Sequence, residues 1–165
     1  MKRLSLLKTL TSILFVLAMA AMIFMIPFFL ITVFAPGEVP FRINGSLATA
    51  MSAEDYLLFA AQIIAFGFWT YAIYLFKSVL GHFEKKQVFN EKVIVLLDQT
   101  GKAILIGFFI NIAAEFLYNT IILGKFSIEA STDTIFVLIL GVFFTVLSEV
   151  FLMAKGLKEE NDLTV

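Results

Sequence analysis

Two acidic residues interrupt long apolar runs in this sequence. Their carboxyl groups are the side-chain groups of this chain that could take part in chemistry. Glu115 lies inside the run 103–124, and Glu149 lies inside the run 134–154. An ionised carboxylate within a membrane is costly unless it is paired, so such residues often belong to proton or cation pathways. These two positions therefore define the first question about function.

The two acids differ in depth and are not expected to act as a catalytic pair. At ~1.5 Å per residue, Glu115 lies ~15 Å from Lys125 at the end of its run, and Glu149 lies ~9 Å from Lys155. We expect Glu115 to be protonated or hydrogen-bonded near mid-membrane. Its candidate partners at comparable depth are Gln62 and Asn119. Near the membrane surface, Glu149 could be neutralised by Lys77 or Lys102.

Small and polar residues recur at matching positions around both acids. The two sets are Gly107, Asn111, Ala114 and Glu115, and then Gly141, Thr145, Ser148 and Glu149. Their shared spacing places each set on about a third of a helix's circumference. Small residues let helices approach closely, and polar ones can bond across the seam, so these stripes predict helix packing. The functional alternative is a proton- or ion-coupled transporter or channel subunit, monomeric or oligomeric, that uses Glu115.

The sequence lacks the residues that other kinds of catalysis require. The chain has no Cys and one His, so it offers no thiolate or imidazole cluster for a metal. It contains no phosphate-binding Gly loop and no G-x-S-x-G motif. The net charge of −1 gives no sign of direct nucleic-acid binding. We expect no enzymatic activity, no metal and no cofactor.

The composition indicates the elements that must hold these residues. Hydrophobic residues make up 61% of the chain and charged residues 15%, which excludes an ordinary soluble domain. Apolar runs long enough to cross a bilayer predict an all-α, four-helix membrane bundle in one domain. The expected spans are 9–35, 55–77, 102–124 and 133–155. Ala18-Met19-Ala20 is similar to a signal-peptide cleavage site, but the apolar run continues well beyond it, which favours an uncleaved helix.

Positive residues predict how the helices are threaded. Nearly all lysine and arginine residues lie in three segments: the N-terminal segment, the loop 78–101 with its flanks, and the tail 156–165 with Lys155. The other two loops contain Arg42 and Lys125. Lysine and arginine concentrate on the cytoplasmic side. We therefore expect a multi-pass protein of the inner (cell) membrane, with both termini and the middle loop in the cytoplasm.

Within the middle loop, residues 91–100 have a helical pattern that places Val93, Leu96 and Leu97 on one side. We expect a short cytoplasmic helix there, between the second and third spans, and it could lie along the membrane surface. Periodicity alone equally allows this segment to be an extension of the third membrane helix.

Two segments of the chain resemble a known family. The closing run 149–165 resembles the last segment of a bacterial four-helix membrane protein family, catalogued as domain of unknown function 2975. The residues that carry this resemblance are Glu149, Phe151, Leu157, Glu160, Asp162 and Val165. The middle loop from Lys86, with Phe89 and Asn90, to Gly101 is similar to the family's other recurrent segment. The resemblance covers the chain after its first helix.

This resemblance implies a small inner-membrane protein without an assigned activity. Family members are often encoded beside a short helix-turn-helix regulator, which implies a cytoplasmic protein partner. The matching positions that would contact this partner are Phe89, Asn90, Phe151, Leu157, Glu160 and Asp162. Two further readings stay open: the transporter that uses Glu115, and a purely structural membrane subunit.

Overall fold

The computed structural model describes residues 2–35, 42–43, 46–47, 52–126 and 132–163. Its elements are α1 (Lys2–Phe34), β1 (Arg42–Ile43), β2 (Ser46–Leu47), α2 (Ala53–Glu84), α3 (Glu91–Leu117), the π-helical turn η3 (Tyr118–Ile122) and α4 (Thr132–Leu163). The two short strands pair antiparallel. Four helices, with η3 continuing α3, are long and apolar enough to cross a membrane, as the composition predicted.

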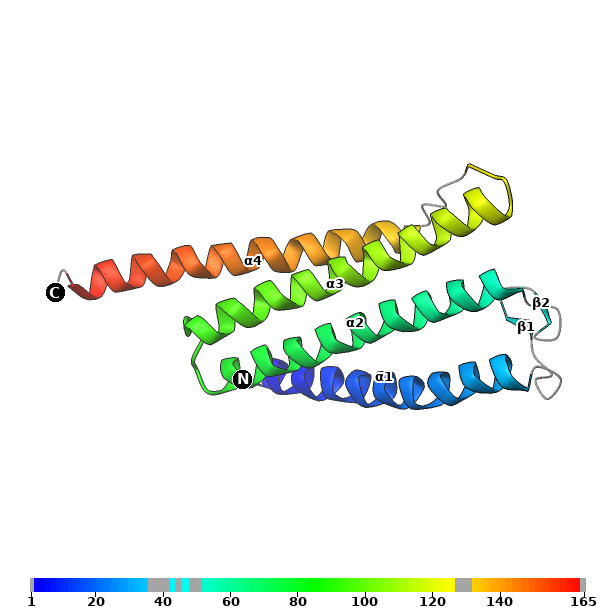
Figure 1. Cartoon of the computed structure of the whole chain (residues 1–165). Coiled ribbons are helices and arrows are strands. Elements are labelled where there is room, and N and C mark those ends of the chain that lie inside the picture. Colours follow the sequence, from blue (N-terminus) through cyan, green and yellow to red (C-terminus); the bar gives the residue numbers. More distant parts are fainter. Residues whose placement is uncertain (1, 36–41, 44–45, 48–51, 127–131, 164–165) are drawn as a thin grey trace.

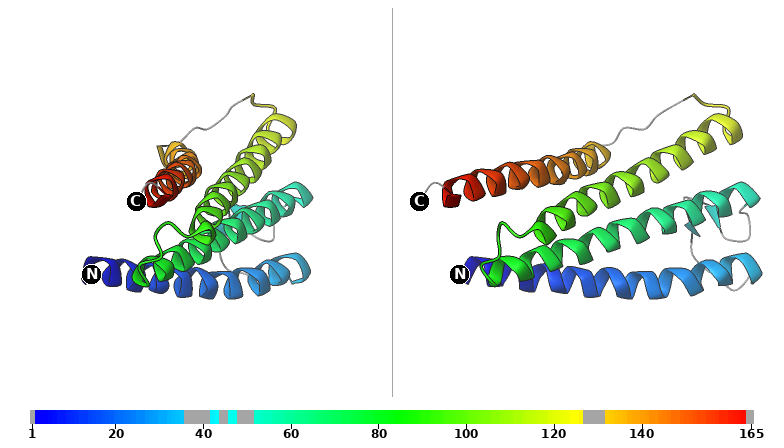
Figure 2. Two further views of the ribbon diagram at one scale, coloured as in Figure 1. Left: turned by 90° about the vertical axis from the view of Figure 1, so that its left-hand side faces the viewer. Right: turned by 60° about the vertical axis from the view of Figure 1, so that its left-hand side comes forward.

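The four helices lie side by side in chain order, with α1 at one edge and α4 at the other (Figure 1). The extensive contacts join α1 to α2, α2 to α3, and α3 to α4. Helices that are neighbours in sequence run antiparallel, so α1 and α3 begin at the same end where α2 and α4 finish (Figure 2). We call this end, which holds Lys8, Lys85 and Lys155, the lysine-rich end, and the other one the opposite end.

The expected separate short helix between the second and third spans is wrong. Residues 91–100 form the first part of α3, which runs unbroken from Glu91 to Leu117. Asn90 begins this helix because its side-chain oxygen accepts a hydrogen bond from the Lys92 backbone N–H at 2.9 Å. Val93 and Leu97 are buried on the same helix as Ile104, so one packed face continues through this segment and keeps it in α3.

All four helices are longer than the spans expected from hydropathy. At ~1.5 Å per residue, the 32-residue helices α2 and α4 are ~48 Å long, whereas the hydrocarbon core is ~30 Å thick. The added turns of α4 are mostly polar, whereas those of α2 include Val79 and Leu80, which are buried. Helix α4 continues through Gly156 as far as Leu163.

The best-buried core lies towards the lysine-rich end and comes from three helices. Its fully buried members include Val79 from α2 and Val93 and Leu97 from α3, and Phe144 of α4 packs on the same cluster. In contrast, the most apolar window of α1 has no buried residue. We infer that α2, α3 and α4 form the packed body and that α1 covers one edge of it.

Glycines allow α3 to approach a different neighbour on each side. A Cβ atom on Gly101 would lie 2.8 Å from the carbonyl oxygen of Gly141, so the backbones of α3 and α4 nearly touch there. A Cβ atom on Gly107 would lie 2.5 Å from Nε1 of Trp69 on α2. Since real Cβ atoms do not approach so closely, both contacts depend on glycine.

Candidate functional site

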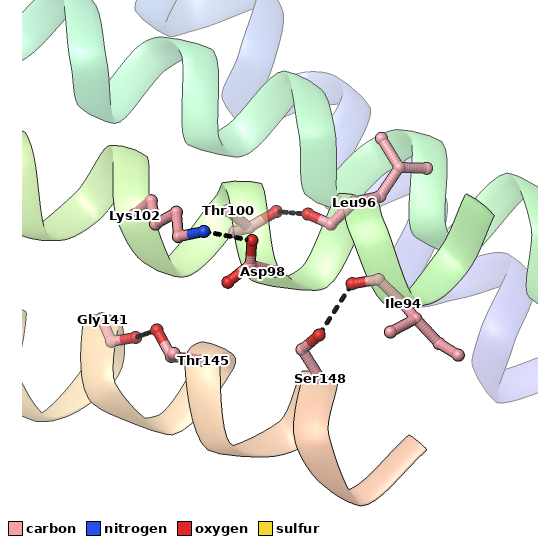
Figure 3. A network of polar contacts seen from close by, with 8 residues as sticks. All are labelled: Ile94, Leu96, Asp98, Thr100, Lys102, Gly141, Thr145 and Ser148. Carbon is pink, nitrogen blue, oxygen red and sulfur yellow. Dashed lines mark hydrogen bonds and ion pairs between the residues drawn. The ribbon is translucent and has the colours of Figure 1, made fainter. Parts of the chain in front are cut away.

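The polar residues of α3 and α4 do not form one common seam. Gly107 faces Trp69 of α2, while the residue of α3 that faces Thr145 of α4 is Gly101. Thr145 donates its hydroxyl hydrogen bond to the Gly141 carbonyl oxygen of its own helix at 3.1 Å (Figure 3). The stripes therefore belong to two separate contacts, because α3 is an inner helix with a neighbour on each side.

Ser148 makes a hydrogen bond that joins α4 to α3. Its buried hydroxyl group donates to the backbone carbonyl oxygen of Ile94 at 2.8 Å (Figure 3). Glu149, the next residue, is exposed on the outside of α4. The two lysines expected near it are engaged elsewhere, because Lys102 pairs with Asp98 at 2.6 Å and Lys77 lies over the ring of Phe15.

Glu115 finds its hydrogen-bond partner within its own helix. The Asn111 side-chain amide donates to Oε1 of Glu115 at 2.9 Å, and both residues are half-buried. Gln62 and Asn119, the expected partners, are also half-buried, but within the described part of the chain neither is hydrogen-bonded to Glu115. Asn119 lies in η3, where its backbone carbonyl oxygen accepts from the Lys125 N–H at 2.9 Å.

The residues at the lysine-rich end come together into a cluster that ties α4 to the α2–α3 turn. The rings of Phe83 and Phe151 stack at 5.8 Å, and Phe89 lies 6.2 Å from Phe151. The ammonium group of Lys158 lies 6.0 Å from the centroid of Phe89. Lys155 bridges Glu91 of α3 at 3.9 Å and Glu159 of α4 at 3.7 Å. We call the three rings of Phe83, Phe89 and Phe151, together with the two lysines that contact this end, the aromatic cluster.

Beyond this cluster, the last turns of α4 leave their side chains exposed. Leu157 is 68% exposed, a large value for a leucine, and Glu160 and Asp162 are also exposed. Figure 1 shows this end of α4 projecting past the ends of the other three helices. The predicted partner-contacting residues thus divide into two groups. Phe89, Asn90 and Phe151 hold the local structure, whereas Leu157, Glu160 and Asp162 are exposed along the last turns of α4.

Sequence reasoning did not single out several residues that organise these contacts. Phe83 stacks in the aromatic cluster, Gly101 sets the α3–α4 approach, and Tyr118 bonds to Asp55 between η3 and α2. A glycine in a helix interior is a signal that could have indicated Gly101. The other two contacts join residues far apart in sequence, so no local pattern indicates them.

Four long apolar helices, with neighbours that run antiparallel, define this chain as a helical multi-pass membrane protein. A family model described as Protein of unknown function (DUF2975) matches residues 40–165, and the chain belongs to this family. The match includes the aromatic cluster and the α4 end, and it begins after α1. No curated protein and no solved structure matches the chain.

Proposed function

We propose that this chain is a regulatory or sensory membrane protein that holds a small cytoplasmic helix-turn-helix regulator at its lysine-rich end. The observation that carries the proposal is the projecting end of α4, where Leu157 is 68% exposed and two carboxylates, Glu160 and Asp162, are exposed beside it. An exposed leucine beside carboxylates suits a partner surface that has an apolar pocket and basic residues around it. The loop and tail that resemble the family's recurrent segments meet at this same end.

The aromatic cluster supports this role because it couples the projecting segment to the membrane helices. Phe151 packs between Phe83 of α2 and Phe89 of the α2–α3 turn, and Ser148 bonds to α3 one turn earlier. A shift of α2 or α3 within the bilayer would therefore move α4 together with any partner bound to it. This is the connection that a membrane sensor requires.

The ion-coupled alternative receives less support from the positions of the two acids. Ser148, the residue before Glu149, is hydrogen-bonded to Ile94 of α3. Glu115 lies 21 residues after Ile94 on the same helix, which is ~31 Å at ~1.5 Å per residue. Glu149 also points away from the packed body. The two carboxylates therefore do not line one short pathway.

Co-purification tests the proposal. The tagged full chain is expected to capture a small helix-turn-helix regulator, of the kind implied by the family resemblance, from solubilised membranes, and deletion of residues 157–165 is expected to abolish capture. Leu157→Ser should weaken binding about tenfold, since a leucine loses most of its burial energy when replaced by serine. Leu123→Ser, which changes an exposed leucine at the opposite end, serves as the matched control. Equal capture by the deletion variant would refute the proposal.

A further inference from the structure

A groove follows the line where α1 packs on α2. It has a volume of about 390 Å³ and is lined on α1 by residues between Phe15 and Ile26, and on α2 by residues between Gly67 and Tyr74. The α1 side alone extends ~16 Å at ~1.5 Å per residue. A hollow that extends along two helices in this way suits a linear molecule rather than a compact one.

The walls of this groove are apolar. Met19 and Met22 contribute flexible side chains from α1, and the stacked rings of Tyr71 and Tyr74 contribute from α2. Thr70 also lines the groove, and its hydroxyl group donates a hydrogen bond to the Phe66 carbonyl oxygen at 2.9 Å. Since this hydrogen-bonding group is already satisfied, the groove favours hydrocarbon over water.

A positive charge stands at the lysine-rich end of the groove. The ammonium group of Lys77 lies 5.3 Å from the ring centroid of Phe15, which lines the groove. Among the described residues Lys77 has no ion-pair partner, whereas Lys8 on α1 is paired with Glu84 at 2.5 Å. Lys77 also marks the expected membrane boundary of α2. The groove therefore runs from a cation at the membrane surface towards the hydrocarbon interior.

A second, smaller hollow adjoins the groove on α2. It has a volume of about 270 Å³, is lined by Ile64 and Phe68, and shares Gly67 and Tyr71 with the groove. Two neighbouring apolar depressions with one cation match the parts of a two-chain anionic lipid.

We propose that the groove holds one acyl chain of an anionic phospholipid from the leaflet at the lysine-rich end, with the lipid phosphate at Lys77. The second acyl chain lies in the hollow beside Tyr71. Charge complementarity selects the anionic headgroup, because an unpaired lysine at a membrane surface attracts anionic lipid. The apolar walls select the chains.

Native mass spectrometry of the detergent-purified full chain tests the headgroup contact, with phosphatidylglycerol and phosphatidylcholine of identical acyl chains as probes. Lys77→Gln should reduce affinity for phosphatidylglycerol about fivefold and affinity for phosphatidylcholine much less, because the choline cation already balances the charge of that lipid's phosphate. Lys85→Gln, which removes an equal charge from an exposed site near the end of the same helix, should change neither affinity. Unchanged phosphatidylglycerol binding by Lys77→Gln, or an equal loss in both variants, would overturn the proposal.

Gly67→Leu tests the groove itself. A Cβ atom at Gly67 would lie 3.5 Å from the Met22 methyl group, an ordinary contact, so the longer side chain extends into the groove and should weaken binding of both lipids. Gly81→Leu, where a Cβ meets open space on the same helix, is the control.

Photocrosslinking of the unmodified chain with a phosphatidylglycerol probe gives a readout that does not depend on a variant's folding. Adducts should concentrate at 15–26 and 64–74, whereas even labelling of α1 and α4 or chain-to-chain crosslinks through the groove would exclude this lipid site.

Discussion

The hydroxyl group of Tyr118 donates a hydrogen bond to Oδ1 of Asp55, and this contact joins the end of the third helix to the start of the second. Asp55 also accepts from the Ser52 backbone N–H at 2.7 Å through its other oxygen, as part of the capping box that begins α2. One carboxylate therefore caps α2 and fastens η3 to it.

Tyr118→Phe removes this bond and leaves the ring in place. We expect the free energy of unfolding to fall by about 1 kcal/mol, because a hydrogen bond to a carboxylate is lost at a partly exposed site. Denaturation in mixed micelles, followed by circular dichroism, measures the change. Tyr74→Phe, at an exposed ring, should have no effect. Equal stability of the two variants would show that the Asp55 contact does not hold the helices together.

The close approach of α3 and α4 at Gly101 makes a second prediction. Gly101→Ala places a methyl group 2.8 Å from the backbone oxygen of Gly141, which cannot move aside as a flexible side chain could. We expect a loss of about 1–3 kcal/mol in the free energy of unfolding. Gly156→Ala, at a helical position where the added methyl group meets open space, should be neutral or stabilising by up to about 1 kcal/mol. A stable Gly101→Ala variant would contradict the packing described here.

The membrane helices could be predicted from sequence because hydropathy measures what the bilayer requires. It did not give their full lengths, since the last turns of α4 are mostly polar and the last turns of α2 depend on the burial of Val79 and Leu80. It also left the state of residues 91–100 open, because a surface helix and a helix extension have the same periodicity. Burial of Val93 and Leu97 by tertiary contacts decides between them.

The candidate polar sites were harder to predict. Periodicity places Gly107 and Asn111 on one face of α3, but it does not say which neighbour that face meets. An inner helix divides its small residues between two partners, so Gly101 serves α4 while Gly107 serves α2. The groove beside Lys77 depends on how α1 lies on α2, and no pattern within either helix reports this.

Glu115 offers a test of whether its role is packing or ion coupling. Glu115→Gln keeps an oxygen that can accept from the Asn111 amide, so the free energy of unfolding should change by less than about 0.5 kcal/mol. Glu115→Ala leaves that amide without this acceptor and should cost about 1 kcal/mol. In proteoliposomes, we expect proton flux through the unmodified chain and Glu115→Gln to be equally low. A flux that disappears in a folded Glu115→Gln variant would instead favour the ion-coupled alternative.

The absence of cysteine from the sequence makes the membrane orientation directly measurable. Gln87→Cys lies in the exposed turn between α2 and α3 at the lysine-rich end, and Lys125→Cys lies exposed after η3 at the opposite end. Because lysine and arginine concentrate on the cytoplasmic side, a membrane-impermeant maleimide should label Lys125→Cys in intact spheroplasts and Gln87→Cys after permeabilisation. The unmodified chain controls for background labelling. The reverse pattern would place the projecting end of α4 outside the cell, where it could not hold a cytoplasmic regulator.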